Sequence, residues 1–412
     1  MHKPLQPALL LTLIAWPLAA TADMVGDVHD LALRTARAAG AAGSAPYTLT
    51  LVDLAMFDAA NAIERRYEPY RAQPTPPAGA DANAAALGAG CAVIAALHPS
   101  QQAATGTACD AIAATLPATT ATAEGRKFGE ATGAAQVAAR QGDGPGAPNR
   151  YRPFTVAGAY VPTVLPLGFD AATMKPFALS SPSQFRPGPP PALTSDAWAR
   201  DCNEVKTLGA RNSTLRTPEQ TATAQFWASN GPQQYLDSAS GLPPIAPSGV
   251  ADRARFFALL SMAISDAGIA VFDAKYAYNF WRPVTAIRNG DLDGNDATER
   301  DAGWLPLVDT PLHPEYPCAH CTVGAAYAAV LALHLGDGEL AVPLSLKPAS
   351  AAGRTPAARS WKRVADFVPE VANARVWGGV HYRNSTEAGM ATGSAVGRWI
   401  VTTQLRPLPA TR

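Results

Sequence analysis

The chain contains 412 residues, of which 48% are hydrophobic and only 16% are charged. Its 33 basic and 33 acidic residues balance, which excludes a general electrostatic attraction to nucleic acid or to anionic lipid as the basis of function. Any anion-binding site must therefore be local. The length leaves open one large helical domain or two fused helical bundles.

The N-terminus has the pattern of a secretory signal. Lys3 precedes an apolar run over residues 9–20, and small residues follow it. This pattern predicts a signal peptide over residues 1–22 and a mature domain over 23–412. We expect a periplasmic or secreted protein. No later segment reaches about 18 uninterrupted apolar residues, so the sequence predicts no stable membrane span.

Most of the chain shows helical periodicity, beginning with the apolar positions between residues 51 and 63. Strand signals are sparse, so the predicted fold class is all-α, with one or more helical bundles and few or no strands. Further helices are predicted over residues 84–97, 102–116, 123–140, 195–208, 218–227, 251–278, 320–335, 360–367 and 381–402.

Residues 141–193 are rich in glycine and proline and show no period. They indicate either a long irregular excursion or a linker between two helical halves. The residues that carry chemistry follow this segment, in a half that we place at about residues 251–405.

Two of the five cysteines fit a structural disulfide, which an exported protein can form. Cys91 and Cys109 lie in consecutive helical segments separated by a short break, as in a helical hairpin. We favour a bridge between them. The alternative is two buried free thiols, because free cysteine packs well in a core.

Lys275 and Arg282 form the first candidate motif. Seven residues make about two helical turns, so the spacing predicts that both cationic side chains project from one helix face. Pro283 predicts that the helix ends near Arg282. The alternative is an ordinary helix end at the surface.

The second motif is His320, which follows a proline turn and opens an apolar helix. At a helix start, the macrodipole and the unpaired backbone N–H groups favour an anion. The alternative is a histidine that only caps the helix.

The third motif pairs Arg375 with His381. Six residues apart on one continuous helix, these side chains would face away from each other. Gly378 and Gly379 permit a break that turns both inward. Together the three motifs predict that five side chains converge on a site for a tetrahedral oxyanion.

The order of these motifs resembles the three-part signature of the vanadium-dependent haloperoxidases and of the phosphatidic-acid phosphatase type 2 superfamily that contains them. The haloperoxidase branch is similar in flanking segments as well, so that the resemblance spans nearly the whole mature chain. These segments are residues 55–63, 203–206, 216–220 and 281–288.

The resemblance implies a vanadate cofactor, and no haem, with His381 as the vanadate ligand. Lys275, Arg282 and Arg375 would neutralise the vanadate oxygens, Lys275 would also polarise bound peroxide, and His320 would act as general acid and base. Hydrogen peroxide and a halide would be the substrates.

Two alternatives remain open. With phosphate in the same cradle, the residues would form an acid phosphatase for a small phosphoester, in which His381 attacks phosphorus and His320 protonates the leaving alcohol. A non-catalytic oxyanion-binding relative is the second alternative. The oligomeric state is also open, with a homo-oligomer as one candidate.

The sequence departs from the family where Ser-Gly usually precedes the second-motif histidine. Here Cys318 and Ala319 would line the oxyanion, and a thiol near a centre that reacts with peroxide is prone to oxidation. We hypothesise that a disulfide between Cys318 and Cys321 protects it. The alternative is a redox-active dithiol.

Two further residues stand where the related haloperoxidases line a halide pocket. His313 precedes His320 by seven residues, and a histidine there resembles the bromide-oxidising kind. Phe272 lies one helical turn before Lys275. The alternatives are a turn residue for His313 and a core residue for Phe272.

Overall fold

The structure is a computed structural model that describes residues 23–40, 44–143, 146, 148–229, 231–242, 249–336, 338–347 and 358–409. The predicted signal peptide, residues 1–22, lies outside the described residues. Within these ranges the chain forms 13 α-helices and one sheet of two strands, so the all-α prediction is confirmed.

The helices are given in chain order. The first five are α1 (Met24–Ala38), α2 (Ala45–Glu64), α3 (Ala82–Leu97), α4 (Gln102–Ala113) and α5 (Thr120–Ala138). The next three are α6 (Asp196–Leu208), α7 (Pro218–Ser229) and α8 (Pro232–Ala239). The last five are α9 (Val250–Tyr278), α10 (Pro283–Arg288), α11 (Ala319–Leu335), α12 (Val364–Trp377) and α13 (Arg383–Thr403).

Short elements complete the fold. Strands β1 (Leu344–Leu346) and β2 (Arg359–Trp361) pair antiparallel, with Leu344 opposite Trp361. Three 3-10 turns are η2 (Pro99–Gln101), η3 (Ala171–Thr173) and η4 (Gly290–Leu292).

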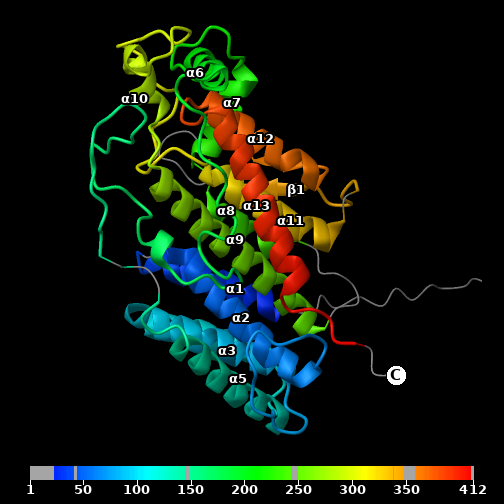
Figure 1. Ribbon diagram of the computed structural model, residues 1–412. Helices are drawn as coiled ribbons and strands as arrows, with labels where there is room; N and C mark the ends of the chain where they lie inside the picture. Colours follow the sequence, from blue (N-terminus) through cyan, green and yellow to red (C-terminus); the bar gives the residue numbers. More distant parts are fainter. Residues whose placement is uncertain are drawn as a thin grey trace, which may run out of the picture.

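The helices form layers around α9. Figure 1 shows α3 and α5 along one edge of the molecule, α1 and α2 beside them, and α9 between this layer and α11 to α13. One cluster of buried apolar side chains includes members of α1, α2, α9, α11 and α13. The N-terminal and C-terminal helices therefore share a hydrophobic core.

Helix α9 has 29 residues and is long and apolar enough to cross a membrane, but 83% of its apolar window is buried inside the protein. Helices α3 and α4 also pass this test as a pair, with a bend of 112° between them. Burial on all sides explains why α9 lacks a polar face, since a helix that is apolar all round belongs in a core.

Seven of the predicted helices, from residues 84–97 through 320–335, are confirmed to within three residues at each end. The prediction over residues 360–367 is wrong at its start, because Ser360 and Trp361 pair with β1 and the helix begins at Val364. Helices α1, α8 and α10 and both strands were not predicted. Helix α13 begins at Arg383 and not at His381, because Tyr382 has an extended backbone.

The predicted glycine break between α12 and α13 is confirmed. Helix α12 ends at Trp377, and Gly379 has a φ of +76°, a conformation that favours glycine. His381 therefore lies in the short connection before α13 and not on a helix.

A buried carboxylate on α9 is among the groups that hold the irregular segment 141–193 against this helix. Asp266 accepts hydrogen bonds from the backbone N–H groups of Phe177, Ala178 and Leu179 at 2.7, 2.7 and 3.0 Å. Burial raises the pKa of Asp266 to about 6, against the lowering effect of these donors. The sequence left open either an irregular excursion or a linker between two helical halves. In the described residues the segment packs on the core, as expected for an excursion.

A row of glycines brings α13 into close contact with α11. Gly389, Gly393 and Gly397 recur every four residues and so share one helix face. A Cβ atom built on Gly393 would lie 1.9 Å from the carbonyl oxygen of Thr322. The two helices that flank the candidate site can approach this closely only because these side chains are absent.

We therefore expect Gly393→Ala to force α11 and α13 apart and to lower the free energy of unfolding by about 1–3 kcal/mol or more, as overpacking does. Urea denaturation measures the loss. The matched control is Gly106→Ala on α4, where a Cβ meets nothing within 4 Å. The control should leave stability unchanged or raise it by up to about 1 kcal/mol. Equal effects of the two substitutions would contradict this account.

Candidate oxyanion site

Three cationic side chains are buried together in the C-terminal half of the molecule. Lys275 lies near the end of α9, Arg282 directly precedes α10, and Arg375 lies in the last turn of α12. Their relative exposures are 0%, 1% and 2%. Buried charges need partners, so the hydrogen bonds around them define the site.

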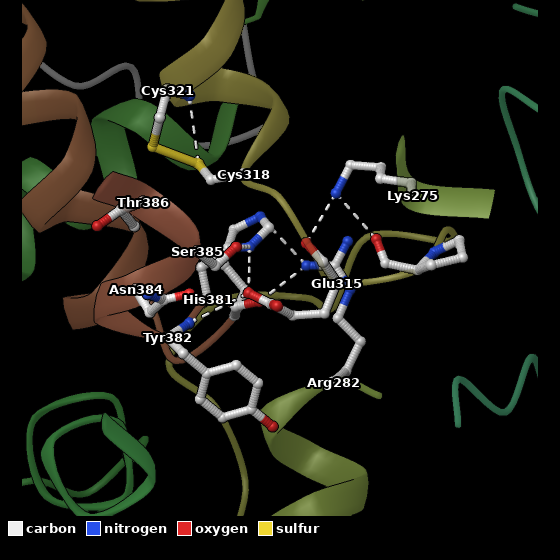
Figure 2. Close-up of polar contacts among 12 residues, drawn as sticks. Lys275, Arg282, Glu315, Cys318, Cys321, His381, Tyr382, Asn384, Ser385 and Thr386 are labelled. Carbon is white, nitrogen blue, oxygen red and sulfur yellow. Dashed lines mark hydrogen bonds and ion pairs between the residues drawn. A yellow bond between two sulfur atoms is a disulfide. The ribbon is translucent and has the colours of Figure 1, made fainter. Parts of the chain in front are cut away.

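Lys275 fixes the connection that leads into α11. Its Nζ donates to the carbonyl oxygens of Pro314 and Glu315 at 2.9 and 2.8 Å (Figure 2). Burial holds the pKa of Lys275 well below its usual value, and the neighbouring Arg282 lowers it further. Neutral carbonyls satisfy two of its protons without neutralising its charge.

The prediction that Lys275 and Arg282 share one helix face is wrong. Helix α9 ends at Tyr278, and Asn279 adopts a left-handed backbone with a φ of 47°. Arg282 has an extended backbone, and Pro283 opens α10. Arg282 therefore reaches the site through a turn. The seven-residue spacing between Lys275 and Arg282 fits a continuous helix equally well, so the sequence could not show this turn.

Arg282 connects the second and third motifs. Its Nε donates to the carbonyl oxygen of His313 at 3.0 Å, and its Nη1 donates to the carbonyl oxygen of Val380 at 2.8 Å. The same Nη1 lies 3.2 Å from Nε2 of His381. Burial lowers the pKa of Arg282 to about 10, so this guanidinium stays charged at neutral pH.

The tautomer of His381 follows from these partners. Arginine can only donate, so Nε2 of His381 is the acceptor and Nδ1 carries the proton. Nδ1 then donates to Oε1 of Glu315 at 2.7 Å, and Figure 2 shows this carboxylate beside the ring. Burial, with Arg282 and Lys275 next in effect, holds the pKa of His381 well below its usual value. His381 is thus a neutral imidazole that turns its Nε2 lone pair toward cations.

Glu315 was missed by the sequence analysis. It is fully buried, and its Oε1 also accepts from the backbone N–H of Tyr382 at 3.2 Å. Burial raises its pKa to about 7, although Arg282 and Lys275 act in the opposite direction. The available signal was an acidic residue between Pro314 and Pro317, two positions after His313, in an otherwise uncharged stretch.

The N-terminus of α13 is fixed by contacts with α6. Arg383 pairs with Glu204 at 2.5 Å, and the backbone N–H of Asn384 donates to Asp201 at 2.8 Å. These contacts fix the start of α13 and the connection that contains His381. Helix α6 therefore helps to position His381 through the backbone of α13.

The site carries an excess of positive charge. Three cations, Lys275, Arg282 and Arg375, and one carboxylate, Glu315, give +3 − 1 = +2 when all four groups are charged. Arg375 donates from Nη1 to the carbonyl oxygen of Trp227 at 3.0 Å, while its buried Nε has no hydrogen-bond partner among the described residues. A doubly charged tetrahedral oxyanion matches both the excess charge and the unused donor.

Helix α11 begins next to these cations. Cys318 is the N-cap, and Ala319 and His320 are the first two residues of the helix. The prediction that His320 stands at a helix start is confirmed. The macrodipole adds positive potential at this point.

Both predicted cysteine pairs are bonded, Cys91 with Cys109 and Cys318 with Cys321. The sulfur of Cys318 accepts from the backbone N–H of Cys321 at 3.2 Å. A disulfide sulfur has no proton, so the side chain of Cys318 cannot donate to an oxyanion. That Cys318 lines an oxyanion stays a prediction. Cys202, the fifth cysteine, is a buried free thiol.

A cavity of 620 Å³ reaches the site, and its lining includes His313, Ala319, His320 and Phe272. The rings of Phe272 and His313 meet edge to face, with centroids 5.1 Å apart. Nδ1 of His313 lies 3.0 Å from Nη2 of Arg282 and 3.1 Å from the carbonyl oxygen of Pro314. Because the guanidinium can only donate, we assign the proton of this imidazole to Nε2. Burial, Lys275 and Arg282 hold the pKa of His313 well below its usual value and keep the ring neutral.

Part of the chain is similar in sequence to known proteins. Residues 255–408 match the family model of the VCPO second helical-bundle domain. The vanadium chloroperoxidase of Curvularia inaequalis is 31% identical over 186 residues. These parts of the chain are therefore similar in sequence to the vanadium haloperoxidases. The resemblance given by the three motifs is thereby confirmed.

The haloperoxidase fold extends over almost the whole chain. A bacterial vanadium-dependent iodoperoxidase superposes with a TM-score of 0.77 over 95% of this chain and 98% of its own, at 22% identity. The apo form of a bacterial vanadium-dependent chloroperoxidase covers 86% of this chain and 91% of its own, with a TM-score of 0.68 and 18% identity. The Curvularia match spans 38% of this chain and 29% of that relative's length.

Among the cations of this site, Arg375 tests the charge argument most simply. We expect Arg375→Met to weaken binding of inorganic phosphate about 10- to 100-fold, because it removes a charged hydrogen-bond donor and lowers the net charge of the site. Titration calorimetry measures the affinity. Arg398→Met, at an exposed position of α13, is the control and should bind phosphate like the unsubstituted protein. Unchanged affinity in Arg375→Met would place the anion elsewhere.

Proposed function

We propose that this protein is a vanadate-dependent haloperoxidase that uses hydrogen peroxide to oxidise a halide, with bromide preferred. The observation that supports the proposal is the buried site itself. It combines an excess of positive charge with a neutral histidine, His381, whose Nε2 lone pair faces Arg282 at 3.2 Å. A cation-binding site would require the opposite charge.

Vanadate fits the donors present. Nε2 of His381 would be its ligand, and Lys275, Arg282 and Arg375 would offset the charge of its oxygens. When bound, vanadate supplies a Lewis-acid centre that activates peroxide without changing its own oxidation state. Glu315 holds the proton of His381 on Nδ1 and so keeps Nε2 available, as carboxylates do for metal-bound histidines.

His320 moves protons in this proposal. It stands at the start of α11 and lines the cavity, where substrates arrive. In the overall reaction a halide, hydrogen peroxide and one proton give a hypohalous acid and water. His320 takes a proton from peroxide and returns it to the departing oxygen as water forms.

The preference for bromide rests on His313 and Phe272. The proton on Nε2 of neutral His313 offers one hydrogen bond, and the aromatic edge beside it offers none. A halide that enters must give up most of its hydration. Bromide is less strongly hydrated than chloride and is easier to oxidise, so this pocket favours bromide over chloride.

We also propose that the protein acts outside the cytoplasm, in the periplasm or after secretion. The N-terminal pattern over residues 1–22 supports this location, as do the two disulfides, since such bonds persist in oxidising compartments.

A phosphatase is the second candidate, and the neutral state of His381 fits it as well. An imidazole whose Nε2 lone pair lies inside a cationic cradle becomes a nucleophile toward a phosphoester when that lone pair leaves Arg282, which donates to it here at 3.2 Å. The two reactions use the same residues and differ in the central atom of the oxyanion.

One pair of assays separates these functions. Purified protein is incubated with orthovanadate, peroxide and bromide plus a dye that accepts bromine, and separately with a chromogenic phosphomonoester without vanadate. We expect bromination that His381→Ala lowers at least about 100-fold, because the substitution removes the vanadate ligand. His334→Ala, at the far end of α11, should retain activity.

Phosphate release that vanadate inhibits, without bromination, would instead establish the phosphatase. If neither activity appears while vanadate still binds, both enzyme assignments fail and a non-catalytic oxyanion-binding relative remains.

A further inference from the structure

The disulfide between Cys318 and Cys321 lies where the helices of the oxyanion site meet. Both cysteines are completely buried and form a small cluster with Ala372 of α12 and Met390 of α13. Ala372 precedes Arg375 by three residues, so the two side chains are neighbours on one face of α12. The disulfide therefore contacts all three of the helices that hold the second and third motifs.

Backbone contacts link this disulfide to His381. The N–H of Cys318 donates to the carbonyl oxygen of Ser385 at 3.0 Å, and Oγ of Ser385 lies 3.4 Å from Nδ1 of His381. Figure 2 shows the disulfide close to Ser385, where α11 and α13 begin. A shift of Cys318 would therefore move the start of α13 and the connection before it, which contains His381.

The disulfide is tightly enclosed on the side of α13. A Cβ atom built on Gly389 would lie 2.6 Å from the carbonyl oxygen of Cys318 and 3.1 Å from Cβ of Cys321. Two thiol sulfurs cannot stay as close together as two bonded sulfurs, so reduction has to separate them. Because the interior is close-packed, this separation has to move the first turn of α11 or the start of α13.

The same disulfide closes a very short loop. It joins residues three positions apart, whereas the disulfide between Cys91 and Cys109 joins residues 18 positions apart. A disulfide stabilises a fold mainly by restricting the unfolded chain, and this effect grows with the length of the loop. The main effect of the Cys318–Cys321 bond is therefore local, on the helix start that contains His320.

We propose that this disulfide is a redox switch for the oxyanion site. The bond holds the starts of α11 and α13 in the arrangement that binds an oxyanion, and its reduction weakens that binding. The inference rests on the proposed function and adds regulation to the same site. Cys318 and Cys321 are positioning residues, because they act through His320 and His381.

Hydrogen peroxide, a substrate in the proposed function, closes the reduced switch. One cysteine sulfur attacks a peroxide oxygen, the O–O bond breaks, and a sulfenic acid and one water form. The sulfur of the second cysteine then displaces the sulfenic oxygen, which leaves as a second water. The two sulfurs lose two electrons and peroxide gains them. The site is therefore weak in the reduced chain and assembled where peroxide is present.

Removal of each disulfide in turn tests the switch. Cys318→Ala with Cys321→Ala should weaken binding of inorganic phosphate at least about 10-fold in titration calorimetry, a coupling of ordinary size, but should lower the midpoint of urea denaturation only slightly. The matched control is Cys91→Ala with Cys109→Ala. It should lower the midpoint more and leave phosphate affinity unchanged. Equal phosphate affinity in the two variants would overturn the proposal.

Linkage gives a second test that keeps Cys318 and Cys321 in place. If the bond strengthens phosphate binding about 10-fold, saturating phosphate must favour formation of the bond by the same factor. The Cys91→Ala, Cys109→Ala protein is equilibrated with mixtures of reduced and oxidised dithiothreitol, its thiols are alkylated, and mass spectrometry gives the oxidised fraction at Cys318. Phosphate should raise that fraction, and Arg375→Met should abolish most of the effect. No effect of phosphate would contradict the coupling.

Reoxidation completes the test. The same protein is reduced, freed of dithiothreitol and treated with one equivalent of hydrogen peroxide. We expect the disulfide to form again and phosphate affinity to return with it. A disulfide that forms again without any recovery of affinity would overturn the proposal.

The outcomes separate the switch from the proposed function. Phosphate binding that is the same with the bond formed, reduced or removed overturns the switch while bromination persists. Redox-dependent phosphate binding without bromination refutes the proposed function, and the switch of the oxyanion site stands.

Discussion

The structure depends on placing three cations and one carboxylate together in one buried site. Lys275, Arg282 and Arg375 are almost completely buried, and each uses backbone carbonyls as hydrogen-bond partners. Carbonyls satisfy the donors but leave the charge. Burial and this unbalanced charge together hold the pKa of His381 well below its usual value, and the excess charge indicates an oxyanion as the missing partner.

The remainder of the fold places the ends of five helices around the oxyanion site. The site residues lie at the end of α9, before α10, at the start of α11, at the end of α12 and before α13. Glycines let α13 lie directly on α11, and Asp266 holds the excursion against α9. Connections at helix ends can adopt left-handed or extended backbone conformations that helices cannot. The packed helices on either side hold these connections, and the site side chains on them, in place.

Much of this could be predicted from local patterns. Helical periodicity predicted most of the helices. Gly378 and Gly379 predicted the break between α12 and α13 that places His381 outside a helix. Both disulfides followed from spacing and context. These features depend on neighbouring residues, which a single sequence displays.

The parts that failed depend on contacts between distant segments. The interval between Lys275 and Arg282 fits a helix, but Asn279 ends α9 and a turn produces the same convergence. Glu315 acquires its role only when the third motif folds against it. Strand β2 needs β1 as a partner, and the cavity needs the excursion opposite α9. None of these partners is adjacent in sequence.

The central claim is that the buried cations and His381 hold one tetrahedral oxyanion, and a calorimetric titration of the purified protein with orthovanadate tests it most directly. The account predicts a single saturable site per chain from which inorganic phosphate displaces vanadate competitively. Absence of saturable binding, or binding that excess phosphate does not reduce, would contradict it.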